Sequence, residues 1–86
     1  MFKIQRSANG RVIVFSLSGR IEAIHVNELR TLLDSEADGR NLVLDLREVK
    51  LIDRDIVGFL TSCEAKGILL ANCPAYIREW IERERA

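Results

Sequence analysis

Two aspartates, Asp45 and Asp53, come closest in this chain to a pair of carboxylates for acid–base or metal chemistry. Asp45 interrupts an apolar run, and Asp53 follows that run where a helix is expected to begin. Such a pair normally works with a histidine, a cysteine cluster or a glycine-rich phosphate loop, and none accompanies these two. Helix capping and turn formation explain Asp53 without any chemistry. The sequence therefore predicts a protein that is not an enzyme and that binds neither a metal nor a cofactor.

The other reactive side chains are one histidine and two cysteines. His25 stands near the start of an expected helix, where a surface or half-buried imidazole able to sense pH is a more ordinary role than catalysis. Cys63 falls on the buried stripe of a helix, whereas Cys73 precedes Pro74 and is the better candidate for oxidation. Two cysteines at this spacing match no metal motif, so we expect reduced thiols.

The composition limits the classes of partner. The chain has 86 residues, of which 48% are hydrophobic, and this suits one domain, residues 1–86, with a modest core. Its 13 basic and 13 acidic residues cancel, so the overall charge favours neither nucleic acid nor an anionic membrane as a partner. No apolar segment reaches the length of a membrane span, and the N-terminus lacks the apolar core of a signal peptide. We expect a cytoplasmic protein.

The first half of the chain predicts a β-hairpin followed by a helix. Polarity alternates on both sides of Asn9–Gly10, a dipeptide that accepts the positive φ angles of a tight turn. The second strand should end at Gly19. A helical stripe follows, beginning at Ile24 or Val26, and the helix should stop within residues 35–39, where Gly and Asp cluster.

The stretch Asn41–Gly58 is the centre of the predicted fold. Residues 42–46 form a nearly continuous apolar run, which is typical of a central strand buried on both faces. A polar crossing, Arg47–Lys50, should then lead to Asp53 as the cap of the next helix. In an open sheet with helices packed on it, the end of such a strand faces a crevice where partners dock. We therefore expect function at Asp53–Asp55.

The second half predicts a helix from Arg54 to Lys66, a short strand at Ile68–Ala71 and a last helix after Pro74. The predicted order is ββαβαβα. It describes an α/β fold with a single-layer mixed sheet of four strands, an N-terminal hairpin and helices packed on the sheet. On the last helix, Tyr76 and Trp80 suit core or edge packing, or the contact of a dimer.

The residues also support a resemblance. The runs FSLSGRIEAIHVNELRTLL and NLVLDLREVKLIDRDIVGFL resemble the STAS domain, the fold of bacterial anti-sigma-factor antagonists. The matching features are Gly19, a strand ending in Asp45–Leu46, Asp53 at the start of the next helix, and Gly58 in its first turns. The resemblance implies a non-enzymatic signal-transduction module that regulates transcription by binding a protein partner, an anti-sigma factor or a kinase-like switch protein.

One position departs from the pattern of this family. The phosphorylated antagonists carry serine or threonine after the helix-opening aspartate, and here that position is Arg54. Arginine cannot accept a phosphoryl group as a hydroxyl does, so we expect no phosphorylation at this site. Arg54 is then a solvated surface residue or a partner contact, because a guanidinium binds carboxylates bidentately. Asp55 could also supply a fixed negative charge in place of phosphate. The chain resembles a minimal version of the domain.

We expect the partner surface to comprise the exposed side of the second helix and the residues Arg20, Glu22, Asp53, Arg54 and Asp55. Two alternatives remain open. The first is a constitutive dimerisation or assembly module that uses the last helix and a sheet edge, and a homodimer is compatible with either role. The second is a sensor of a small ligand at the crevice.

Overall fold

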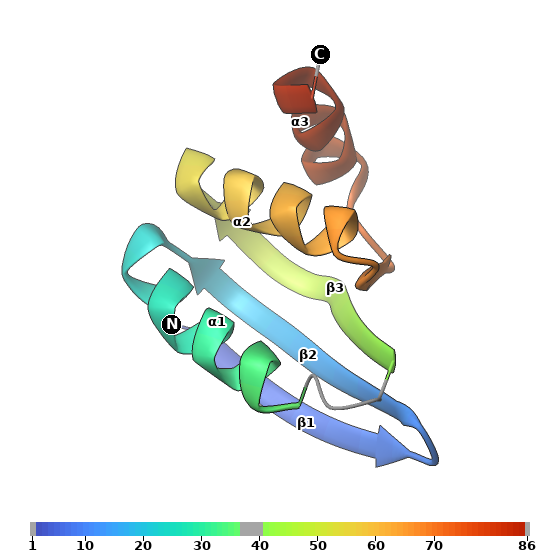
Figure 1. Ribbon diagram of the computed structural model, residues 1–86. Coiled ribbons are helices and arrows are strands. Elements are labelled where there is room, and N and C mark those ends of the chain that lie inside the picture. Colours follow the sequence, from blue (N-terminus) through green and yellow to red (C-terminus); the bar gives the residue numbers. More distant parts are fainter. Residues whose placement is uncertain (1, 37–40, 86) are drawn as a thin grey trace.

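The computed structural model describes residues 2–36 and 41–85, and they form a four-stranded sheet with three α-helices and one 3-10 helix, η1 (Figure 1). In chain order the elements are β1 (Phe2–Asn9), β2 (Val12–Ile21), η1 (Ala23–His25), α1 (Val26–Ser35), β3 (Asn41–Ile52), α2 (Arg54–Ala65), β4 (Leu69–Ala71) and α3 (Ala75–Arg85). The predicted order ββαβαβα is confirmed. Part of the predicted stop of α1, residues 37–39, lies outside the described residues.

The sheet has the strand order β1-β2-β3-β4. The first two strands pair antiparallel around a turn in which Gly10 has a φ of 64°, as the Asn-Gly signal predicts. Ser7–Asn9 belongs to β1 and not to the turn, so the turn residues are Gly10 and Arg11. The pairs β2–β3 and β3–β4 are parallel, as expected for strands that are joined through helices.

The hydrophobic core lies on one face of the sheet. Alternate residues of β2, among them Ile13, Phe15 and Leu17, are at most 3% exposed and pack with the buried sides of the helices. Figure 1 shows α1 and α2 in front of the sheet, with α3 beyond α2. Burial also alternates along the first half of β3, so the prediction of a strand buried on both faces is wrong.

The predicted polar crossing at Arg47–Lys50 is also wrong, because β3 runs without a break to Ile52. Two irregularities in its pairing with β2 each place one extra residue in β3. Buried residues therefore recur every third position, at Leu46, Val49 and Ile52, and the period of two that identifies a strand is lost. Strand β2 likewise continues through Gly19 to Ile21 instead of ending at Gly19.

The helix α3 is fixed to the rest of the chain by polar contacts and an apolar stripe. Glu64 of α2 accepts hydrogen bonds from Arg78 at 2.9 and 3.0 Å and from Arg85 at 2.8 Å. The Tyr76 hydroxyl donates to the Lys50 carbonyl oxygen at 3.2 Å, and Trp80 packs against the core. Both aromatic residues thus have contacts within the chain.

Two glycines should respond in opposite ways to a methyl group. Gly19 has a φ of 87° inside β2, a conformation that costs an L-residue roughly 1–2 kcal/mol. Gly58 lies in a helix where a Cβ atom would meet nothing within 4 Å. We expect Gly19→Ala to lower the free energy of unfolding by about that amount, and Gly58→Ala to raise it by about 0.5–1 kcal/mol. Urea denaturation measures both, and shifts in the same direction would contradict this reading.

The contacts of Glu64 should make stability depend on pH. Hydrogen bonds from Arg78 lower the pKa of Glu64 below its ordinary value of 4.5. A lowered pKa in the folded state stabilises the fold above pH 4.5, and this contribution is lost as the pH falls through the folded-state value. We expect Glu64→Gln to be less stable than wild type at pH 7 and to lose less stability on acidification. Parallel stability curves would contradict this account. Glu79→Gln on α3 is the matched control, because Glu79 has no ion pair among the described residues.

Candidate functional site

The Asp53 carboxylate joins two segments that are far apart in sequence. One oxygen, Oδ1, accepts the Ile56 N–H at 3.1 Å and so caps α2, as predicted. The other, Oδ2, accepts the Ala23 N–H at 2.8 Å at the start of η1. The first turn of α2 and the segment after β2 are therefore held side by side by one side chain.

The segment that Asp53 holds has further contacts of its own. The Glu22 N–H donates to Nδ1 of His25 at 3.0 Å, and the His25 N–H donates to the Glu22 carbonyl oxygen at 2.9 Å. The His25 ring also packs on Phe2, with ring centroids 4.3 Å apart. Between these anchored residues lies Ile24, which is 82% exposed. An apolar side chain this exposed on a fixed turn is a candidate for partner contact.

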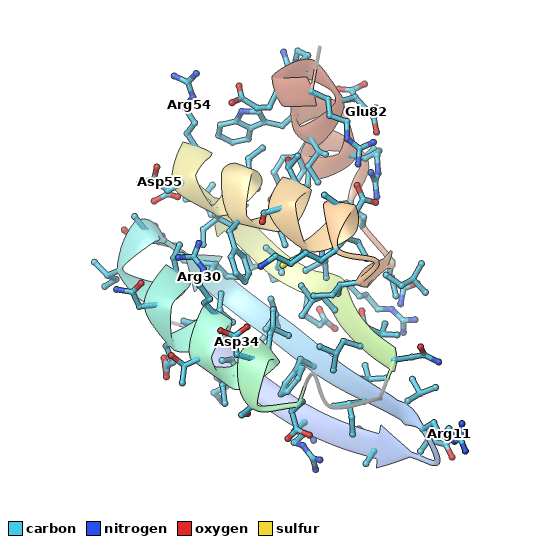
Figure 2. All side chains as sticks on the ribbon, in the orientation of Figure 1. Arg11, Arg30, Asp34, Arg54, Asp55 and Glu82 are labelled. Atoms are coloured by element: carbon cyan, nitrogen blue, oxygen red, sulfur yellow. The ribbon has the colours of Figure 1, made fainter. Side chains whose placement is uncertain are left out.

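Arg54 and Asp55 project from the first turn of α2 into solvent (Figure 2). The Arg54 side chain is 79% exposed, and its Nε lies 3.5 Å from a carboxylate oxygen of Glu84 on α3. A cation at this end of a helix is unfavourable by about 0.3–1 kcal/mol, and the acidic neighbours of Arg54 offset that cost. The guanidinium keeps donors that can bind a carboxylate from another molecule.

The structure brings four of the five predicted residues together. Glu22, Asp53, Arg54 and Asp55 lie at the junction of η1 and α2. Arg20 does not join them, because it precedes the buried Ile21 in β2 and so points to the opposite side of the strand, where it pairs with Leu51.

A groove runs from this junction between α1 and α2. Its lining includes residues with small side chains, Ala23, Gly58 and Ser62, and two opposite charges, Arg30 and Asp55. Figure 2 shows Arg30 reaching from α1 towards α2. Neither Ile24 nor Arg30 was predicted as a site residue. Helical spacing is the signal that could have pointed to them. Arg30 lies off the apolar stripe of α1, and the stripe fits Val26 better than Ile24, so both Arg30 and Ile24 are expected on the surface.

Asp45 and the two cysteines, the other side chains considered for chemistry, have structural surroundings. Asp45 does not pair with Asp53: it accepts the Arg47 N–H at 3.0 Å and the Asn72 amide at 3.2 Å. Burial raises the pKa of the Cys63 thiol to about 11, so the sulfur is protonated and unreactive at neutral pH. Burial also raises the pKa of Cys73.

The described residues contain neither a cluster of metal ligands nor a helix that could span a membrane. In residues 2–36 and 41–85, no three histidine, cysteine or acidic side chains gather as they would around a metal ion. None of the helices in these two segments is long and apolar enough to span a membrane.

Comparisons with solved structures agree on the fold. An anti-sigma-factor antagonist STAS domain from Rhodobacter sphaeroides has a TM-score of 0.67 at 15% identity, over 83% of this chain and 86% of that one. The unphosphorylated anti-sigma factor antagonist SpoIIAA has a TM-score of 0.69 at 15% identity, over 95% and 82% of the two chains. An uncharacterised SpoIIAA-like protein from Shewanella loihica has a TM-score of 0.58 at 16% identity, over 99% and 75%.

The sequence comparisons decide the family. No curated protein sequence is significantly similar to the chain. The family model of the STAS domain, however, matches residues 3–84, which is nearly the whole chain. Together with the four-stranded sheet in the order β1-β2-β3-β4 and its three α-helices, this match shows that the chain belongs to the STAS domain family.

Proposed function

We propose that this protein is a regulatory module that binds another protein through the junction of η1 and α2. The observation that carries the proposal is Ile24, an apolar side chain that is 82% exposed on a turn fixed by Asp53. Isolated exposed apolar residues are common, but this one adjoins an open groove and two charged side chains, Arg54 and Asp55. An apolar anchor with a charged rim is the usual anatomy of a protein interface.

The partner class that we favour is an anti-sigma factor or a kinase-like switch protein in the cytoplasm. The support is the fold, which the chain shares with proteins described as anti-sigma-factor antagonists. Binding would then act on transcription without any catalytic step.

Arg54 separates this chain from antagonists that are switched by phosphorylation. The side chain at this position has no hydroxyl group and already contacts Glu84. We propose that the partner surface is constitutively active: Arg54 binds a carboxylate of the partner, and a kinase has no acceptor at this position. Asp55 gives the first turn a fixed negative charge beside it.

Affinity capture from the native cytosol, quantified by mass spectrometry, tests the proposal. We expect wild type to retain an anti-sigma factor or a kinase-like regulator. Ile24→Lys should reduce this retention about tenfold or more, because it replaces an apolar anchor by a charge. Arg54→Glu should reduce it by reversing the charge that faces the partner.

Arg11→Glu is the matched control for Arg54→Glu, because Arg11 lies on the hairpin turn far from Arg54 (Figure 2). The intact mass of Arg54→Ser, recovered from the same cytosol, tests whether Arg54 stands in place of a phosphorylation site. Added phosphate on this variant and none on wild type would support a lost acceptor. Recovery of the same proteins by wild type, Ile24→Lys and Arg54→Glu would contradict the proposed surface.

A further inference from the structure

The face of the sheet opposite the helices is bare in the described structure. None of the helices in residues 2–36 and 41–85 lies behind the sheet in Figure 1, and the buried core lies on the helical side. Strands β2, β3 and β4 are parallel, and sheets made only of parallel strands are almost always covered on both faces, whereas the antiparallel β1 makes this sheet mixed. The parallel part of this face is therefore a candidate for a second covering layer.

Its side chains are those of a surface that another molecule covers. Val14, Val43 and Leu69 pair in register across three neighbouring strands, so their side chains form one apolar row. Each alternates with core residues and so points away from the helices, and Leu69 is 62% exposed. Val12 lies two residues before Val14 on the same face, so it extends the apolar surface along β2.

We propose that a second copy of this chain covers the face, so that two sheets pack against each other about a two-fold axis. The argument for a second copy is charge. One row across β1, β2 and β3 consists of Lys3, Ser18 and Glu48. Strand β2 therefore lies between the cation, Lys3, and the anion, Glu48. All three residues border one shallow depression on this face. Neither Lys3 nor Glu48 has an ion pair among the described residues.

A two-fold axis that runs along β2 between the sheets reverses the strand order of the second copy. Such an axis places Lys3 of each copy over Glu48 of the other, and Ser18 over Ser18. The row is therefore complementary to itself, as a two-fold interface requires. The chain also has no net charge, so two copies do not repel one another.

The area is sufficient for a reversible dimer. With the axis along β2, β1, β2 and β3 of the two copies face one another, and three strands about 4.8 Å apart, the second of them ten residues long, make a face of roughly 500 Å², so two faces bury about 1,000 Å² in total. This is below the size of stable interfaces and in the range of weak, transient ones, so we expect a dimer that dissociates on dilution. The face lies on the opposite side of the sheet from the helices, so a dimer would display two copies of the η1–α2 junction.

Sedimentation velocity of the full chain over a range of concentrations tests the proposal. We expect a monomer–dimer equilibrium in wild type and monomers in Val14→Lys, because the axis along β2 places Val14 of the two copies over one another. Ile24→Lys is the matched control, since it adds the same charge to an exposed apolar residue on the helical side and should leave the equilibrium unchanged.

Charge exchange identifies the face even if Val14→Lys fails to fold. Lys3→Glu and Glu48→Lys each place like charges together twice and should each raise the dissociation constant about tenfold. A mixture of these two variants should form heterodimers with the wild-type constant, and a chain carrying both changes should pair as wild type does. Monomers at every concentration, loss of the dimer in Ile24→Lys, or no recovery in the mixture would each overturn the proposal. This result is independent of whether a regulatory partner is found.

Discussion

One carboxylate with two acceptors holds together the junction of η1 and α2, the proposed partner surface of this STAS domain. Asp53 binds the Ile56 N–H with one oxygen and the Ala23 N–H with the other, at 3.1 and 2.8 Å. Without the first bond, the N-terminus of α2 loses its cap, and without the second, η1 loses its tie to α2. Together with the pairing of Ile21 with Ile52, which precedes both segments, these bonds set the position of Ile24 relative to Arg54.

Arg54 changes what the first turn of α2 can do. A hydroxyl group at the start of a helix could be phosphorylated, and the helix end would stabilise the added charge. A guanidinium reverses this logic, because it is a permanent cation with donors that suit carboxylates. The contact with Glu84 shows that the side chain already recognises an acidic group within its own chain. On the proposed function, the first turn of α2 therefore has one fixed charge state.

The sequence was sufficient for the element order, the hairpin, the strand pairing and the cap at Asp53, since each depends on local signals such as Gly10 or an apolar period. It failed where local geometry broke the period. Two extra residues in β3 set the buried positions Leu46, Val49 and Ile52 three apart, which made a strand resemble a crossing. The grouping of Glu22 with Asp53–Asp55 was predicted, but strand alternation turns Arg20 away from α2, and Ile24 was hidden in an apparent helical stripe.

Amide hydrogen exchange of Asp53→Ser tests the central role of Asp53 most directly. A serine hydroxyl can cap α2 but cannot also reach a second amide, so the two bonds become separable. We predict that the Ile56 amide stays protected while the Ala23 amide exchanges much faster than in wild type, with the sheet amides unchanged. Unchanged protection of the Ala23 amide would contradict the account, because η1 would then be held to α2 by something other than Asp53.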